Sequence, residues 1–240
     1  MSGAHGESGV EMLRLDVRSE ESVAACVSAV LDRAGHIDVL VNNAGVMHQG
    51  FAEETGPDQA SAVFATNLFG VARVTNPVLP GMRSRRRGRI INVGSLAAWV
   101  GEPGEAYYAA SKAALARYTE ALRHEVWPLG ISVSLVEPGA FTTGVIQASP
   151  VAEPVFADYD GAREAARRTL QESLRRGDDP RTAPRSSPPG TSRDPALVSA
   201  GRCGHTAWWR VRRRAPNQTG GRGWNRSSSA VCTTKSSVPA

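Results

Sequence analysis

The sequence predicts an α/β protein with a doubly wound parallel sheet, and three observations predict it. Short apolar runs at 37–41, 88–95 and 131–136 have the length and composition of buried parallel strands. Each run leads into a polar turn that contains glycine. The stretches between the runs read as helices, so strands and helices alternate along the chain. In a sheet of this type, ligands bind at the carboxyl ends of the strands.

The first expected elements are a strand at 12–15 and a helix after it. Ser19 is suited to cap that helix, and Glu20 and Glu21 in the first turn favour its positive end. Apolar residues at helical spacing continue to Gly35, which ends the helix. This order of elements begins a βαβ unit.

The next elements are the strand at 37–41 and a long helix. The strand runs into Asn42-Asn43-Ala44-Gly45, whose small residues let a ligand approach the backbone. Pro57 opens the helix, which carries Asn67, and Pro77 is expected to end or kink it.

Arginines crowd the segment that precedes the strand at 88–95. Positions 83–89 hold five arginines, for which a solvated loop is favoured over a phosphate-binding patch. The strand itself ends at Ser95, which places a hydroxyl at the ligand-binding edge. The last expected strand, 131–136, is followed by a turn that begins Glu137-Pro138-Gly139.

A tyrosine and a lysine stand four residues apart, at Tyr108 and Lys112, in a segment expected to be helical. Residues at this spacing share one face of a helix, so the ammonium can sit one turn from the phenol. A nearby positive charge favours the phenolate, which makes the pair a candidate proton donor and acceptor near neutral pH. Taken alone, an aromatic residue packed on its helix beside a solvated lysine explains the pattern equally well.

Together these motifs resemble the short-chain dehydrogenase/reductase family of the Tyr-x-x-x-Lys type. The resemblance covers residues 10 to about 176, with the motifs in the family's order and spacing. It implies a Rossmann-like fold and hydride transfer between NAD or NADP and an alcohol or carbonyl substrate. The matching residues are Asp16, Val17, Asn43, Ala44, Gly45, Asn67, Ser95, Tyr108, Lys112, Pro138, Gly139 and Thr143.

The resemblance implies a role for each matching residue. Tyr108 would be the general acid and base, and Lys112 would lower its pKa and hold the nicotinamide ribose. Ser95 would donate a hydrogen bond to the substrate oxygen, and Asn67 would fix a water molecule. Contacts to the cofactor would come from Asn43, Ala44 and Gly45 at the adenosine ribose, Asp16 and Val17 at the adenine, and Pro138, Gly139 and Thr143 at the nicotinamide.

Three of these residues have simpler interpretations. Asp16 could cap the end of a strand, Asn67 could be a polar residue within a helix, and Thr143 could be a turn hydroxyl.

The family's Gly-rich turn, Thr-Gly-x-x-x-Gly-x-Gly, has no counterpart in this chain. Its amides and the helix after it hold the cofactor pyrophosphate. We therefore expect an N-terminally truncated sheet. The two missing strands would lie, in the sheet, between the strand at 12–15 and the strand at 37–41. The strand at 12–15 would have no neighbour, and the strand at 37–41 would be an open edge that invites association. The choice between NAD and NADP depends on the missing part.

The chain divides by composition near residue 177. Residues 1–176 are expected to form the partial dehydrogenase domain, with a substrate lid at 151–176 that includes a helix at 160–175. Residues 177–240 contain 11 basic and 3 acidic residues among many prolines, serines and glycines, which predicts a disordered tail. A nucleic-acid tail is the less favoured functional interpretation. Out-of-frame translation of GC-rich coding sequence gives the same composition.

Composition limits the remaining properties. The three cysteines, Cys26, Cys203 and Cys232, make neither a metal-binding spacing nor a disulfide framework. No apolar run approaches the length of a membrane span, and a cytoplasmic location is expected. The expected partners are a small alcohol or ketone substrate and, in a full-length form, further copies of the chain. A catalytically inactive remnant, or a basic-tailed binding protein on the same scaffold, is the alternative to an enzyme.

The 240-residue chain should bind NAD and NADP much more weakly than a relative that has the Gly-rich turn. The reason is that the amides of that turn and helix attract the pyrophosphate charge. Isothermal titration calorimetry with either dinucleotide measures the affinity, and a micromolar dissociation constant would contradict the expectation.

Overall fold

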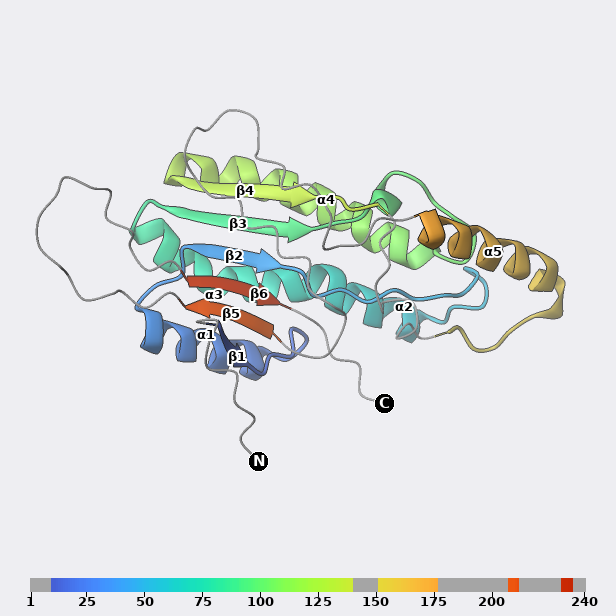
Figure 1. The fold of residues 1–240 in the computed structure, drawn as a ribbon, viewed down its shortest axis with the longest axis horizontal. Helices are drawn as coiled ribbons and strands as arrows, with labels where there is room; N and C mark the ends of the chain where they lie inside the picture. Colours follow the sequence, from blue (N-terminus) through green and yellow to red (C-terminus); the bar gives the residue numbers. More distant parts are fainter. Residues whose placement is uncertain (1–9, 140–150, 177–206, 212–229, 235–240) are drawn as a thin grey trace, which may run out of the picture.

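The computed structural model describes residues 10–139, 151–176, 207–211 and 230–234. In the described part a six-stranded sheet has the order β1-β5-β6-β2-β3-β4 (Figure 1). Neighbouring strands β6, β2, β3 and β4 pair in parallel, and β5 is antiparallel to both its neighbours. The strands are β1 Val10–Leu13, β2 Val39–Asn42, β3 Gly88–Val93, β4 Ile131–Val136, β5 Ala207–Val211 and β6 Ala230–Thr234.

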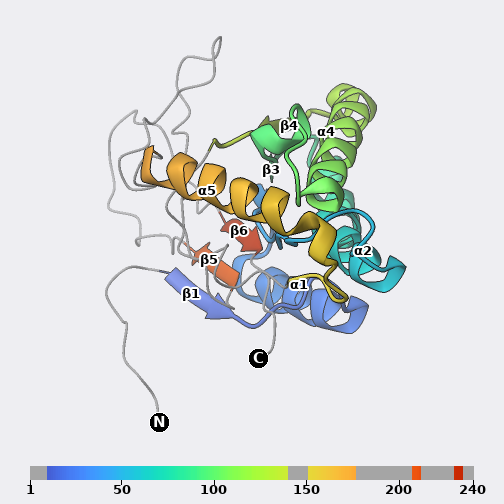
Figure 2. The same ribbon diagram turned by 90° about the vertical axis from the view of Figure 1, so that its right-hand side faces the viewer.

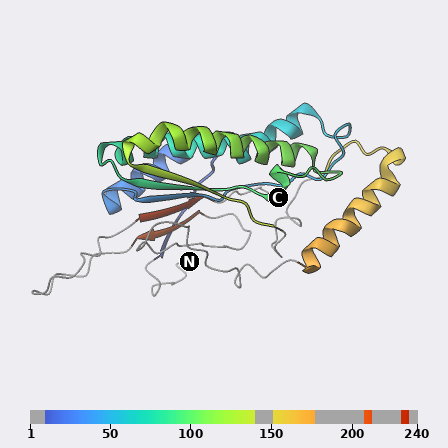
Figure 3. The same ribbon diagram turned by 90° about the horizontal axis from the view of Figure 1, so that it is seen from above.

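Helices α1, α3 and α4 lie on one face of the sheet (Figure 3). Helix α5 crosses the end of the sheet to which the parallel strands point (Figures 1 and 2). The α-helices are α1 Glu20–Ala34, α2 Pro57–Phe64, α3 Gly70–Ser84, α4 Ala106–Val126 and α5 Asp160–Arg176. The α/β fold class is confirmed.

The ends of α1 are the predicted ones. Ser19 is the N-cap, and its hydroxyl oxygen accepts a hydrogen bond of 3.1 Å from the backbone N–H of Ser22. Gly35 closes the helix in the left-handed conformation, with φ 74°, which glycine adopts without strain.

Of the two alternatives predicted for Pro77, an end of the helix is excluded, because α3 continues through Pro77 and Pro80 to Ser84. A proline inside a helix removes one hydrogen bond and usually destabilises it. Here Val74, Val78 and Met82 on the buried face of α3 belong to the hydrophobic core. We infer that this burial offsets the missing backbone bonds.

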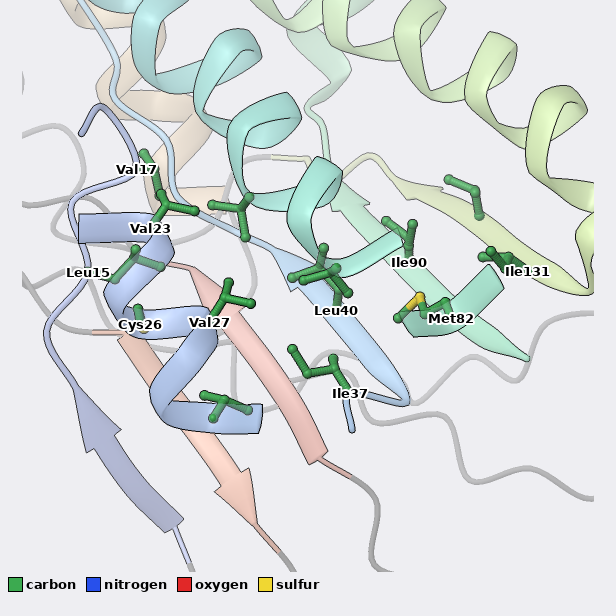
Figure 4. Packing of buried hydrophobic residues seen from close by; sticks show 14 of the residues in the cluster. Leu15, Val17, Val23, Cys26, Val27, Ile37, Leu40, Met82, Ile90 and Ile131 are labelled. Atoms are coloured by element: carbon green, nitrogen blue, oxygen red, sulfur yellow. The ribbon is translucent and has the colours of Figure 1, made fainter. Parts of the chain in front are cut away.

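The core lies between this helical layer and the sheet (Figure 4). Leu40 of β2 and Ile90 of β3 are both 0 % exposed and face each other in the parallel register. Val23 and Val27 of α1 cover the same sheet face nearer to β1, together with Leu15. The apolar runs of the sequence therefore meet in one continuous core.

Two expectations about the sheet edges are wrong. β1 pairs with β5 and β2 pairs with β6, so neither is left without a neighbour. β5 and β6 lie between β1 and β2, and both come from the segment 177–240 that was expected to be disordered. The averaged composition of that segment hides the short stretches Ala-Trp-Trp-Arg-Val and Ala-Val-Cys-Thr-Thr, whose aromatic and β-branched residues favour strands. The rest of 177–240 lies outside the described residues.

Only Arg85 to Arg87 form the exposed loop that was predicted, because Arg83 lies in α3 and Arg89 lies in β3. Two side chains of this loop hold neighbouring backbone. Arg85 donates a hydrogen bond of 2.7 Å to the carbonyl of Ile37, and Arg86 donates one of 2.6 Å to that of Pro128. In the described part of the chain, none of the helices combines the length and the apolar character that crossing a bilayer requires.

Leu40→Ala should lower the free energy of unfolding by about 2–5 kcal/mol, because it leaves a cavity at the centre of the core. Leu31→Ala removes the same atoms from a side chain that is 38 % exposed and should cost about 1 kcal/mol or less. Urea unfolding followed by circular dichroism compares the two. Equal losses in both variants would contradict the placement of the core.

Candidate active site

Five of the predicted site residues come together where β2 and β3 end. Gly45 follows β2, and Ser95 follows β3. Asn67 lies in a π-helical segment, Ala65–Phe69, that joins α2 to α3. Tyr108 and Lys112 lie in the first two turns of α4, which packs against that segment and β4. Strand ends and one helix therefore supply the group, as the sequence predicts for a ligand edge.

Tyr108 and Lys112 share one face of α4. The Nζ atom of Lys112 is 5.9 Å from the centre of the Tyr108 ring. It donates a hydrogen bond of 3.0 Å to the backbone carbonyl of Val93, the last residue of β3. Ser95, two residues further on, is hydrogen-bonded to the Tyr108 side chain. The end of β3 thus positions both polar partners of the tyrosine.

Burial controls the protonation of this pair. It lowers the pKa of Lys112 to about 8, because a buried ammonium loses its hydration. It also raises the pKa of Tyr108, and the negative charge of Glu105 adds to the effect while the hydrogen bond with Ser95 opposes it. The sequence predicted a lowered pKa for Tyr108, so the direction in this structure is the opposite one. Desolvation of the phenol is the larger influence.

Asn67 connects the loop after β2 to α4. Its Oδ1 accepts a hydrogen bond of 2.8 Å from the N–H of Val46, and its Nδ2 donates to the Val46 carbonyl and to Ser111 Oγ, each at 2.9 Å. Ser111 in turn donates a bond of 2.7 Å to the carbonyl of Tyr108. π-helical segments are rare and are often found at functional sites. Asn67 therefore ties the loop after β2 to α4, and the water-binding role that the resemblance implies stays a prediction.

Gly45 leaves space between Asn67 and Lys112. A Cβ atom at this position would lie 3.3 Å from Lys112 Nζ and 3.5 Å from Asn67 Oδ1. The backbone of the Asn43-Ala44-Gly45 turn can therefore come close to the two polar side chains. The sequence analysis gave a different reason for small residues here, the approach of a ligand to the backbone, and that stays a prediction.

The other predicted cofactor residues have different surroundings. Asp16 forms an ion pair of 3.0 Å with Arg18, which lowers the pKa of its carboxyl. Val17 is 1 % exposed, and its side chain packs against Gly70. The carbonyl of Pro138 accepts a hydrogen bond of 3.1 Å from Leu96, beside Ser95, and Gly139 follows it there. Thr143 lies outside the described residues.

The sequence analysis placed Asn42 in the turn after its strand and did not single out Asn92. Asn42 of β2 donates hydrogen bonds to Asn92 of β3, at 2.9 Å, and to Thr75 of α3, at 3.1 Å. Asn92 donates in turn to Thr119 of α4, at 2.9 Å. This network joins two strands to two helices beneath the site. The signal was an asparagine at the end of two neighbouring strands, where a ligand was expected instead.

Two acidic residues were missed as well. Glu105 stands one turn before Tyr108, and burial together with the charge of Glu102 raises its pKa to about 7. Glu54 is 1 % exposed although it follows a glycine-bearing loop. Both line a cavity between the loops near 50 and 103 and the predicted lid. In sequence they had no spacing that would distinguish them from surface carboxylates.

A family model described as short chain dehydrogenase matches residues 2–153 of the chain. The chain belongs to this family.

Several characterised members are similar to it. A 3-ketodihydrosphingosine reductase of Bacteroides thetaiotaomicron is 38 % identical over 174 residues, which cover 72 % of this chain and 65 % of the relative. The 3-oxoacyl-[acyl-carrier-protein] reductase FabG of Vibrio cholerae is 38 % identical over 143 residues, 60 % of this chain and 58 % of the relative. An acetoacetyl-CoA reductase of Shinella zoogloeoides is 40 % identical over 144 residues, 60 % of each.

Solved structures agree. A short-chain dehydrogenase from Streptomyces avermitilis superimposes with a TM-score of 0.61 at 38 % identity, covering 67 % of this chain and 59 % of that one. A gluconate 5-dehydrogenase from Burkholderia cenocepacia, solved with NADP and tartrate, has a TM-score of 0.54 at 34 % identity, covering 56 % and 52 %. The chain thus spans less than two thirds of the length of these relatives.

Lys112→Met should change how stability depends on pH. The pKa of Lys112 is about 8 in the folded protein, against its ordinary value of 10.5, so the unfolded chain binds more protons between these values. The parent should therefore gain stability relative to the variant as pH rises from 8 to 10.5, by up to about 1.4 kcal/mol per pH unit.

Urea unfolding of both proteins across this pH range measures the difference. If the difference in unfolding free energy between parent and variant stays constant, or if the parent loses stability relative to the variant as pH rises, Lys112 is not a desolvated ammonium.

Proposed function

We propose that the protein is an oxidoreductase that transfers hydride between NAD or NADP and an alcohol or carbonyl substrate. The observation that carries the proposal is the arrangement of Ser95, Tyr108 and Lys112 at the carboxyl ends of the strands. A phenol is held there between a hydroxyl on one side and an ammonium one helical turn away.

The residues present fit the nicotinamide end of such a cofactor. Gly45 leaves room beside Lys112 and Asn67 that a side chain would fill. Lys112, buried at this point, would hold the ribose hydroxyls, with the backbone of Asn43 to Gly45 alongside. When bound, the nicotinamide supplies or accepts the hydride.

Tyr108 would move the proton. Its raised pKa keeps the phenol protonated at neutral pH, so it can donate its proton to a carbonyl oxygen that gains negative charge. Ser95 Oγ would donate a hydrogen bond to the same oxygen and stabilise that charge. In the reverse direction the phenolate accepts the alcohol proton, and Lys112 favours that form by its charge.

Asn67 and Ser111 would keep this geometry in place. Their hydrogen bonds connect the carbonyl of Tyr108 to the backbone of Val46. A donor must lie within hydrogen-bonding distance of the atom that it protonates, so the position of α4 matters for the rate.

We propose a 3-keto compound as the substrate. Relatives named as reductases of 3-oxoacyl and 3-ketodihydrosphingosine compounds support this class. A neutral Tyr108 phenol suits the direction of reduction.

Tyr108→Phe should lower turnover by about 10²- to 10⁴-fold, because it removes the proton donor. The assay uses a chimera in which the Gly-rich N-terminal segment of a relative precedes Val10. Reduction of acetoacetyl-CoA is followed by the absorbance of NADPH or NADH.

Tyr107→Phe is the matched control, since it removes a hydroxyl from the adjacent residue, and its turnover should stay close to that of the parent. Activity of Tyr108→Phe within threefold of the parent would refute the role of Tyr108. A parent chimera that binds cofactor but turns over no carbonyl would favour the non-catalytic alternative.

A further inference from the structure

Glu54 is a buried carboxylate far from the catalytic tyrosine in sequence. It is 1 % exposed and lies in the loop between β2 and α2. Its oxygens accept hydrogen bonds from two backbone amides, those of Phe51 at 3.3 Å and Phe156 at 2.8 Å. Burying a charge in this way is costly unless it is paired.

The charge partner of Glu54 is Arg163 of α5, 109 positions further along the chain. The guanidinium contacts both carboxylate oxygens, with its shortest bond, from Nη2 to Oε1, at 2.7 Å. Arg163 also donates to the carbonyl of Phe156 at 3.1 Å and lies 5.6 Å from the centre of the Phe51 ring. The side chain is only 15 % exposed. This is a fork geometry that a lysine does not reproduce.

Further contacts join the same two segments. The ring of Tyr159 stacks on that of Phe51 with centres 4.7 Å apart, and its hydroxyl donates a bond of 2.6 Å to Glu53. Ala152 N–H donates to the carbonyl of Gln49 at 2.8 Å. We call the ion pair between Glu54 and Arg163 the clasp, because it is the buried centre of this junction.

Arg163 lies on the face of α5 that turns inward. Arg163, Ala166 and Leu170, at helical spacing, are half-buried, while the positions between them are exposed. These three residues line one side of the cavity that Glu105 and Pro103 line on the other. Glu105 lies one turn before Tyr108 and its charge acts on that phenol, so this cavity lies next to the first turn of α4.

The walls of this cavity are largely apolar. Phe51, Pro103, Val155 and Leu170 contribute to the lining, and Val155 is 52 % exposed to the opening. Exposed apolar side chains around a cavity favour the binding of an apolar ligand, because its contact removes their surface from water.

We propose that Glu54 and Arg163 are positioning residues that hold α5 as a wall of the substrate cavity and thereby select a substrate with an apolar chain next to its carbonyl. This rests on the proposed function for the identity of the reacting group. The clasp itself acts through α5 and touches neither the reacting carbonyl nor the hydride.

Hydrogen exchange on the 240-residue chain tests the clasp without any turnover. Arg163→Met keeps the apolar stem over Phe51 but leaves Glu54 without its charge partner. The double variant Glu54→Gln and Arg163→Met removes both charges, so no buried carboxylate is left unpaired. Both should speed amide exchange in 160–170 by about tenfold or more, while α4 keeps its protection.

Glu164→Gln is the matched control. It breaks the ion pair between Glu164 and Arg168 on the same helix, whose distance of 2.7 Å equals that of the clasp but whose side chains are 71 % and 63 % exposed. Exchange in α5 should stay at the parental rate, because exposed pairs contribute little.

Ligand selection is measured with two methyl ketones, 2-undecanone and 2-butanone, by saturation-transfer NMR. The parent and the control should prefer the long ketone. The double variant should bind it about tenfold more weakly and bind 2-butanone unchanged, which a general loss of structure would not produce.

Parental exchange in α5 together with parental affinity for 2-undecanone in the double variant would overturn the proposal. Loss of protection throughout α4 and β3 in that variant would overturn it too, since the clasp would then hold the fold rather than the cavity wall. A parent that binds neither ketone contradicts the proposed function, and the exchange comparison still decides whether the clasp holds α5.

Discussion

The side chain of Asn67 makes the junction on which the active site depends. Its amide binds both backbone groups of Val46, so the loop after β2 cannot move without α2 and α3. Through Ser111 it also reaches the backbone of Tyr108. Buried backbone groups have no water to bond to if they lose their protein partners. A network that satisfies all of them is therefore rigid. The π-helical turn around Asn67 is what directs its amide toward this junction.

Burial shifts the pKa values of Lys112 and Tyr108 in opposite directions. It favours the neutral amine of Lys112 and the neutral phenol of Tyr108, so each is held away from its charged form. The same physical cause acts on Glu105, whose pKa rises toward neutrality one turn away. Loss of hydration on burial is therefore the shared cause of the pKa shifts of these three groups.

Backbone pairing along the strand edges stabilises the sheet, as its hydrophobic core does. Leu40 and Ile90 pack under the helices, but β2 also has an edge that must pair or face solvent. In the structure β6 takes that edge in parallel register, and β5 links it to β1. Segments with suitable strand propensity can fill such a place whatever the composition around them.

The sequence by itself indicated the strands and helices between residues 10 and 136 and the ends of α1, because these depend on local spacing. The group Gly45, Asn67, Ser95, Tyr108 and Lys112 came from strand ends that share an edge, from the Tyr108–Lys112 spacing and from the resemblance to the family. Only the tertiary structure decided the rest. The raised pKa of Tyr108 depends on solvent exclusion by residues far away in sequence. The pairing of Glu54 with Arg163 joins positions that no periodicity relates. The places of β5 and β6 follow from hydrogen-bonding edges, which exist only once the other strands have assembled.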